Sequence, residues 1–139
     1  MTIVLTIHIL LTLFMTGLCW FVQIVHYPLF LQIRQEDFAE YEQRNFATGY
    51  ITVPVMIVEW ITGFWMLWET PDVWWMINGA LMIAIGLSTF LFQVPTHLRL
   101  AASPNPQLIR FLIRTNWIRT ASWTLRSILL AIWLIHSLG

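Results

Sequence analysis

The chain has 139 residues, of which 58% are hydrophobic and 10% are charged, against about 25% charged residues in an ordinary soluble domain. Its seven basic residues, all arginine, balance seven acidic residues, so the chain lacks the basic face that a nucleic-acid partner requires. The composition therefore excludes a soluble domain and a nucleic acid as a partner, and it predicts one integral membrane domain over residues 1–139 with the lipid bilayer as its surroundings.

Four segments are long and apolar enough for transmembrane helices, which need about 20 mostly apolar residues. They cover residues 3–31, 48–68, 73–95 and 107–137. The first segment lacks the basic start and small-residue cleavage site of a signal peptide, so we expect it to be a retained span. Asn105 and Pro106 predict the start of the fourth helix, because an N-cap side chain is followed by proline at the first helical position. We expect an all-α bundle of four transmembrane helices.

The strongly polar stretch RQEDFAEYEQRNF, Arg34 to Phe46, lies in the connection over residues 34–47. Two alternatives are open for it: a solvated helical linker, or a short helix held at the membrane interface by its aromatic side chains. This connection and residues 96–114 hold most of the arginines, Arg34, Arg44, Arg99, Arg110 and Arg114. The positive-inside rule then makes both connections cytoplasmic and places both termini on the outer side of a bacterial cytoplasmic membrane.

Polar residues recur on one face of three spans, given about 100° of rotation per helical residue. In the first span they are His8, Thr12, Cys19, Gln23 and His26, with Met15 among them. In the third span they are Asn78, Thr89 and Gln93, with Met82 among them and His97 just past Pro95. In the fourth span they are Asn116, Arg119 and Arg126, with Trp123 among them. These faces are expected to point into the bundle.

Arg126 lies about 18 Å deeper than Arg114 by helix rise, close to the middle of the bilayer. A lone charge at that depth costs about 2.5–3.5 kcal/mol, so it should be paired or face a wet cavity. Glu59 is the acidic residue available within the spans, and we expect it to pair with Arg126 or Arg119. Such a pair can serve helix packing alone. Two arginines for one acid also predict a net cationic site that suits an anion or a developing enolate.

The positions of these polar residues along their spans predict one polar pocket in the cytoplasmic half of the bundle. Its candidate catalytic residues are His26, Glu59, His97, Asn116, Arg119 and Arg126.

Three chemistries are open for this pocket, and the sequence leaves the cofactor unknown. His26, His97 and Glu59 are metal-ligand candidates by residue type, although no Glu-x-x-His spacing is present. His26 with His97, and His8 with His136, could form two haem-ligating pairs, but His8 and His136 are more simply polar helix ends at an interface. Without a cofactor, a phenol or quinol held by Arg119 and Asn116 and deprotonated by His26 or His97 could react with dioxygen.

A resemblance to known proteins rests on three segments: HYPLF (His26 to Phe30), VPTHLRL (Val94 to Leu100) and TNWIRTASWTLRS (Thr115 to Ser127). They resemble the recurring blocks of a group of small bacterial four-helix integral membrane proteins of unknown function. That group is distantly similar to the anthrone-oxygenase-like membrane family, whose last helix carries comparable polar residues in comparable order. The resemblance implies that His26, His97, Asn116, Arg119 and Arg126 line a functional pocket.

Two classes of function follow, and whether the protein is an enzyme stays open. The first is a membrane oxidoreductase acting on a lipophilic aromatic or quinone-like substrate. The second is a non-catalytic accessory subunit of a larger respiratory or photosynthetic membrane complex, in which the tryptophan-rich surface makes contacts. A small haem- or metal-binding membrane protein is a further alternative.

Overall fold

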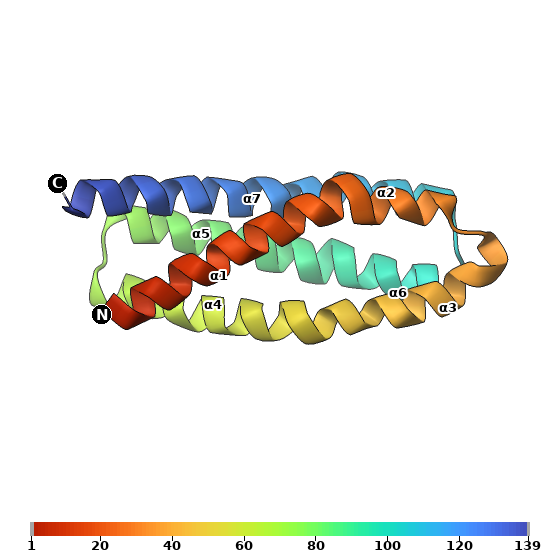
Figure 1. Ribbon diagram of the computed structural model, residues 1–139, viewed down its shortest axis with the longest axis horizontal. Coiled ribbons are helices and arrows are strands. Elements are labelled where there is room, and N and C mark those ends of the chain that lie inside the picture. Colours follow the sequence, from red (N-terminus) through yellow and green to blue (C-terminus); the bar gives the residue numbers. More distant parts are fainter. Residues whose placement is uncertain (1, 139) are drawn as a thin grey trace.

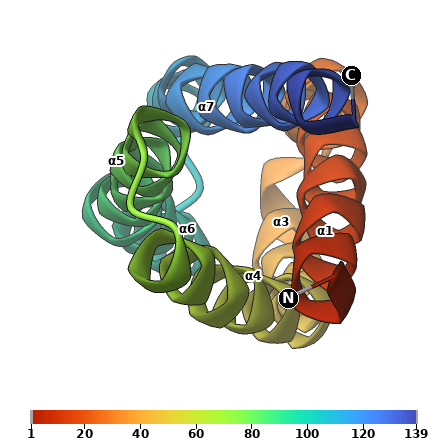
Figure 2. The same ribbon diagram turned by 90° about the vertical axis from the view of Figure 1, so that its left-hand side faces the viewer.

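The computed structural model describes residues 2–138 as four long helical rods that run antiparallel to their sequence neighbours (Figure 1). All four are long and apolar enough to cross a membrane, and no strand occurs among residues 2–138. Viewed from one end, the rods form a four-sided ring in which each rod lies beside two neighbours (Figure 2). The predicted all-α bundle of four transmembrane helices is confirmed.

The first three rods combine regular helix with short 3-10 or π-helical segments, and the fourth is one continuous α-helix. The first contains α1 (Thr2–Phe21), a π-helical segment (Val22–His26), α2 (Tyr27–Leu29) and a 3-10 turn (Phe30–Gln32). The second contains α3 (Gln35–Asn45), a 3-10 turn (Phe46–Thr48) and α4 (Gly49–Glu69). The third contains α5 (Val73–Ser88), a π-helical segment (Thr89–Gln93) and α6 (Val94–Ala102), and the fourth is α7 (Pro106–Leu138).

The rods extend beyond the expected spans at the end of the bundle opposite the termini. Helix α6 continues to Ala102, and α3 runs through one 3-10 turn into α4. Phe38, Glu42 and Asn45, spaced as successive turns of one helix face, are buried where α3 packs against α6. The connection therefore forms a helix that packs one face on the bundle, where Phe38 joins an apolar cluster with Phe30 and other core residues.

Local sequence explains how the rods begin and bend. The Asp72 side chain accepts a hydrogen bond from the Trp75 backbone N–H at 3.0 Å, and Asn105 accepts one from the Gln107 N–H at 2.7 Å. These caps fix the starts of α5 and α7, the second as predicted. Each π-helical segment ends two residues before a proline, Pro28 or Pro95. Proline has no N–H and crowds the preceding turn, and a local wide turn accommodates both effects within a helix.

Glycine lets the helices approach closely at the end of the bundle that holds the termini. A Cβ on Gly63 of α4 would lie 2.6 Å from the Met82 sulfur and 2.7 Å from the His8 ring. Small residues permit this kind of contact between membrane helices. The approach brings α1, α4 and α5 together around His8.

Candidate functional site

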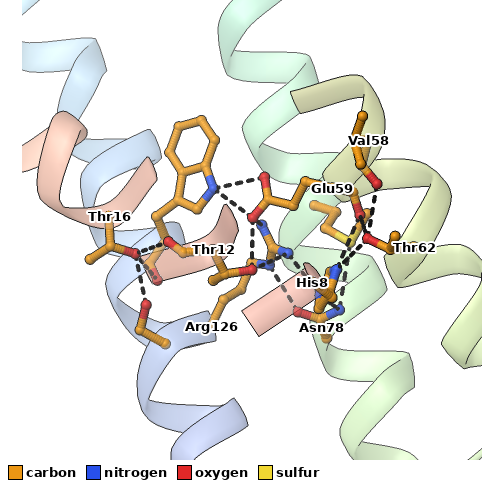
Figure 3. Close-up of polar contacts among 11 residues, drawn as sticks. His8, Thr12, Thr16, Val58, Glu59, Thr62, Asn78 and Arg126 are labelled. Carbon is orange, nitrogen blue, oxygen red and sulfur yellow. Dashed lines mark hydrogen bonds and ion pairs between the residues drawn. The ribbon is translucent and has the colours of Figure 1, made fainter. Parts of the chain in front are cut away.

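A buried ion pair between Glu59 and Arg126 joins α4 to α7 near the middle of the bundle (Figure 3). The Arg126 Nη1 lies 2.8 Å from Glu59 Oε1, and the two side chains are 0% and 1% exposed. The same carboxylate accepts hydrogen bonds from the Thr12 hydroxyl at 2.8 Å and the Trp123 indole N–H at 3.2 Å. The sequence left two arginines as partners of Glu59, and the structure selects Arg126.

His8 completes this network from α1, and Asn78 completes it from α5. Arg126 donates through Nε to Asn78 Oδ1 at 2.8 Å and through Nη2 to His8 Nε2 at 3.3 Å. The Asn78 amide nitrogen also points at His8 Nε2, at 3.3 Å. Because both groups can only donate, His8 Nε2 must be an acceptor, and the ring is neutral with its proton on Nδ1. The expectation that His8 is a polar helix end at an interface is wrong.

The network is closed to its surroundings. His8, Thr12, Glu59, Asn78, Trp123 and Arg126 are all buried. Each charge meets its counter-charge, and every nitrogen of the Arg126 guanidinium and both oxygens of the Glu59 carboxylate have a hydrogen-bond partner within the cluster. A site that is fully satisfied and inaccessible suits helix registration better than ligand binding.

A second buried cluster holds α7 against the first rod. The Asn116 amide donates to Gln23 Oε1 at 2.9 Å, and the Gln23 amide donates to the Ile113 carbonyl at 3.1 Å. Thr120 lies within hydrogen-bond distance of the same Gln23 oxygen. Asn116 is thus engaged between helices and does not line the cavity described next.

A cavity of about 370 Å³ lies between the first and second rods, towards the end that holds α3. Figure 1 shows why space opens there: α1 starts beside α4 and then leans towards α7. The walls are mostly apolar, and the exposed side chains at the mouth include Phe14, Phe21, Ile51 and Val53. Since these residues belong to transmembrane segments, the cavity opens sideways towards the lipid.

Polar side chains from all four rods gather on the inner surface of this cavity. They are His26, Tyr27, Asn45, Thr89, Gln93, His97 and Arg119. We call this set the cavity floor.

The cavity floor contains one cation and one histidine with unused hydrogen-bonding capacity. The Arg119 guanidinium stacks over the Trp123 ring at 5.4 Å, and its buried Nε has no hydrogen-bond partner among residues 2–138. His26 Nε2 lies 2.8 Å from Asn45 Oδ1 and therefore donates to it. A neutral His26 then carries a lone pair on Nδ1. The floor thus offers a positive charge and a base to a molecule in the cavity.

His97 is more fully engaged than His26. Its Nδ1 contacts the Glu42 carboxylate, and its Nε2 lies 3.0 Å from the Tyr27 hydroxyl. Sequence reasoning missed Glu42, Tyr27 and Asn45. The regular spacing of Phe38, Glu42 and Asn45 on one helix face was the available signal for two of them.

The six candidate residues therefore separate into three places. His26, His97 and Arg119 line the cavity, Glu59 and Arg126 lie in the closed ion-pair network, and Asn116 lies in the cluster with Gln23.

The residues present do not fit the metal or haem alternatives. Glu59 is engaged with Arg126 and is not grouped with His26 and His97, and no cluster of three His, Cys, Asp or Glu side chains suited to a metal occurs within residues 2–138. Haem ligation needs an unengaged imidazole nitrogen on each axial histidine. Both ring nitrogens of His8, and both of His97, have hydrogen-bond partners within the bundle.

Comparisons of this chain with protein families, with characterised proteins and with solved structures yield no match.

Proposed function

We propose that the protein is a membrane enzyme that binds a lipophilic aromatic or quinone-like molecule in the cavity and oxidises it. The supporting observation is the pairing of apolar, laterally open walls with a floor that holds Arg119 and His26. A volume of about 370 Å³ falls in the range of small-molecule sites, about 300–1,000 Å³. A molecule dissolved in the bilayer reaches such a site without crossing water.

The floor suits acid–base chemistry on a ring oxygen. In this proposal His26 Nδ1 takes the proton of a ring hydroxyl, and Arg119 stabilises the resulting oxyanion. Asn45 holds the His26 ring in the required tautomer by accepting from Nε2. The anion is more electron-rich than the neutral phenol. Dioxygen then accepts two electrons and two protons from a quinol, which gives the quinone and hydrogen peroxide.

A binding measurement tests the site before any turnover is sought. Decylubiquinone, a water-dispersible quinone, should bind the purified protein in mild detergent and quench its tryptophan fluorescence. Met56→Trp fills the cavity and should weaken this binding at least tenfold. Ile57→Trp, on the neighbouring lipid-exposed position outside the cavity, is the matched control and should leave it unchanged. Equal affinity in both variants would contradict the proposed site.

Activity is tested with the corresponding quinol by oxygen consumption and peroxide formation. His26→Ala and Arg119→Met should lower the rate about 100-fold, because a positioned base and an oxyanion partner each contribute on that scale. Arg114→Gln, exposed on the same helix, is the control. Absence of both binding and turnover, with stoichiometric partner subunits retained in mild detergent, would instead support an accessory role in a larger membrane complex.

A further inference from the structure

Three ionisable side chains next to the cavity form a hydrogen-bonded chain that the chemistry at His26 and Arg119 does not use. Tyr27 lines the cavity, its hydroxyl contacts His97 Nε2 at 3.0 Å, and His97 Nδ1 contacts Glu42 Oε1. Glu42 is buried, and its second carboxylate oxygen has no hydrogen-bond partner among the described residues. A buried acid with an unpartnered oxygen is energetically costly, and a role in binding or in moving a proton is one reason for a protein to keep it.

The hydrogen bonds of this chain have one consistent direction. The Glu42 carboxylate can only accept, so His97 Nδ1 carries the proton. The Asn45 amide nitrogen lies 3.4 Å from Glu42 Oε1 and 3.5 Å from His97 Nδ1. Because it can only donate, the protonated Nδ1 leaves Glu42 Oε1 as its acceptor. A neutral His97 then has its lone pair on Nε2 and accepts from the Tyr27 hydroxyl. The chain therefore points from the cavity to the carboxylate: Tyr27 to His97 to Glu42.

We propose that Tyr27, His97 and Glu42 form a proton relay that takes a proton from the oxygen of a molecule bound in the cavity. The ligand O–H bond breaks as Tyr27 Oη accepts that proton. Tyr27 gives its own proton to His97 Nε2, and His97 gives its Nδ1 proton to Glu42. Three bonds to hydrogen break and three form, which leaves an oxyanion in the cavity and a neutral Glu42.

The surroundings favour transfer along this chain over transfer through water. The Phe30 ring packs against His97, and Phe30, Tyr27 and Phe38 belong to one apolar cluster at this end of the bundle. The ionisable groups near the relay are His26 on the same rod as Tyr27, Tyr41 on α3, and Arg119 on α7, which lines the same cavity as Tyr27. The relay thus leads from the cavity to Glu42, which is buried on α3 in the most polar stretch of the chain.

The direction of the hydrogen bonds in the relay is measurable in the ligand-free protein. Nitrogen-15 NMR of labelled histidine should find the His97 proton on Nδ1 and a hydrogen-bonded lone pair on Nε2. Tyr27→Phe should shift the Nε2 resonance alone, Glu42→Gln should shift Nδ1, and Glu40→Gln, exposed on the same helix, should shift neither. A proton on Nε2 in the unaltered protein would overturn the relay, because Tyr27 could then not donate to His97.

Proton movement is measured on bound decylubiquinone, since the relay rests on the proposed function. Electrochemical reduction of this quinone consumes two electrons and two protons. Proton delivery runs the relay in reverse, from a protonated Glu42 through His97 and Tyr27 to the quinone oxygen, and a pH-indicator dye reports the uptake. Tyr27→Phe and Glu42→Gln should slow uptake about 100-fold while quinone affinity is unchanged, and Glu40→Gln should match the unaltered protein. Failure of the quinone to bind contradicts the proposed function and the relay together. Normal binding with normal uptake in Tyr27→Phe and Glu42→Gln overturns the relay alone.

Discussion

Replacing Arg126 by methionine tests the closed network most directly, because methionine keeps much of the side-chain volume and removes the charge. The change leaves the Glu59 carboxylate, 1% exposed, with neutral donors only. It also deprives Asn78 Oδ1 and His8 Nε2 of a donor. Breaking a buried ion pair by removing one partner costs about 3–5 kcal/mol. We expect a loss of that size in the free energy of unfolding.

The assay is unfolding in mixed micelles at increasing SDS, followed by tryptophan fluorescence. The matched control is Arg44→Gln, which breaks an ion pair of 2.7 Å whose side chains are 80% and 72% exposed. That pair is nearly as short as the 2.8 Å contact of Arg126 with Glu59. An exposed pair contributes about 0–1 kcal/mol, so Arg44→Gln should change stability little.

The double variant Glu59→Gln with Arg126→Met separates charge from packing. Glu59→Gln alone leaves an uncompensated guanidinium, so it should also be strongly destabilising, whereas the double variant removes both charges. Its loss should be smaller than the sum of the two single losses by about 0.5–3 kcal/mol. A loss below about 1 kcal/mol for Arg126→Met, or strict additivity, would refute the reasoning that burial makes this pair stabilise the bundle.

Three further changes probe the fold. Gly63→Ala places a methyl group less than 3 Å from neighbouring side chains and should lower the free energy of unfolding by about 1–3 kcal/mol in the same assay. The control Gly17→Ala has no atom within 4 Å of the added methyl group and should be neutral or stabilising. Asp72→Ala removes the N-cap of α5 and should lower stability by about 1 kcal/mol; an unchanged melting temperature would contradict that role. Trp123→Phe removes the indole N–H that contacts both Glu59 oxygens and should cost about 1–3 kcal/mol, with the exposed Trp117→Phe as the neutral comparison.

The helical periodicity of the sequence predicted much of the architecture. Polar residues on one face of the first span, His8 through Gln23, are buried, because the helical repeat decides which side chains share a face regardless of partner. Hydropathy and length likewise predicted four spans, since a membrane helix satisfies its own backbone hydrogen bonds. The choice of Glu59 as a counter-ion followed from its being the acid within a span.

Periodicity does not predict which polar residues of different helices meet. The position of each residue along its helix and the tilt of the helices decided this. Arg119 and Arg126 share a face of α7, so the repeat does not say which one meets Glu59. The lean of α1 away from α4 makes the difference: it opens a cavity beside Arg119 and leaves Arg126 enclosed. A single polar pocket was expected, and the polar residues instead separate into a closed ion pair, an amide cluster and a cavity floor.

The sequence by itself determined the four apolar helices, their inward faces and the need to neutralise a deep charge, because these depend on side-chain chemistry and helix geometry within one segment. Only the tertiary structure decided that Glu42, in the most polar stretch of the chain, is buried against His97. The physical reason is that burial of α3 depends on the apolar surface that α6 and Phe30 present to it. The spacing of residues 34–47 indicates a shared helix face but does not encode that surface.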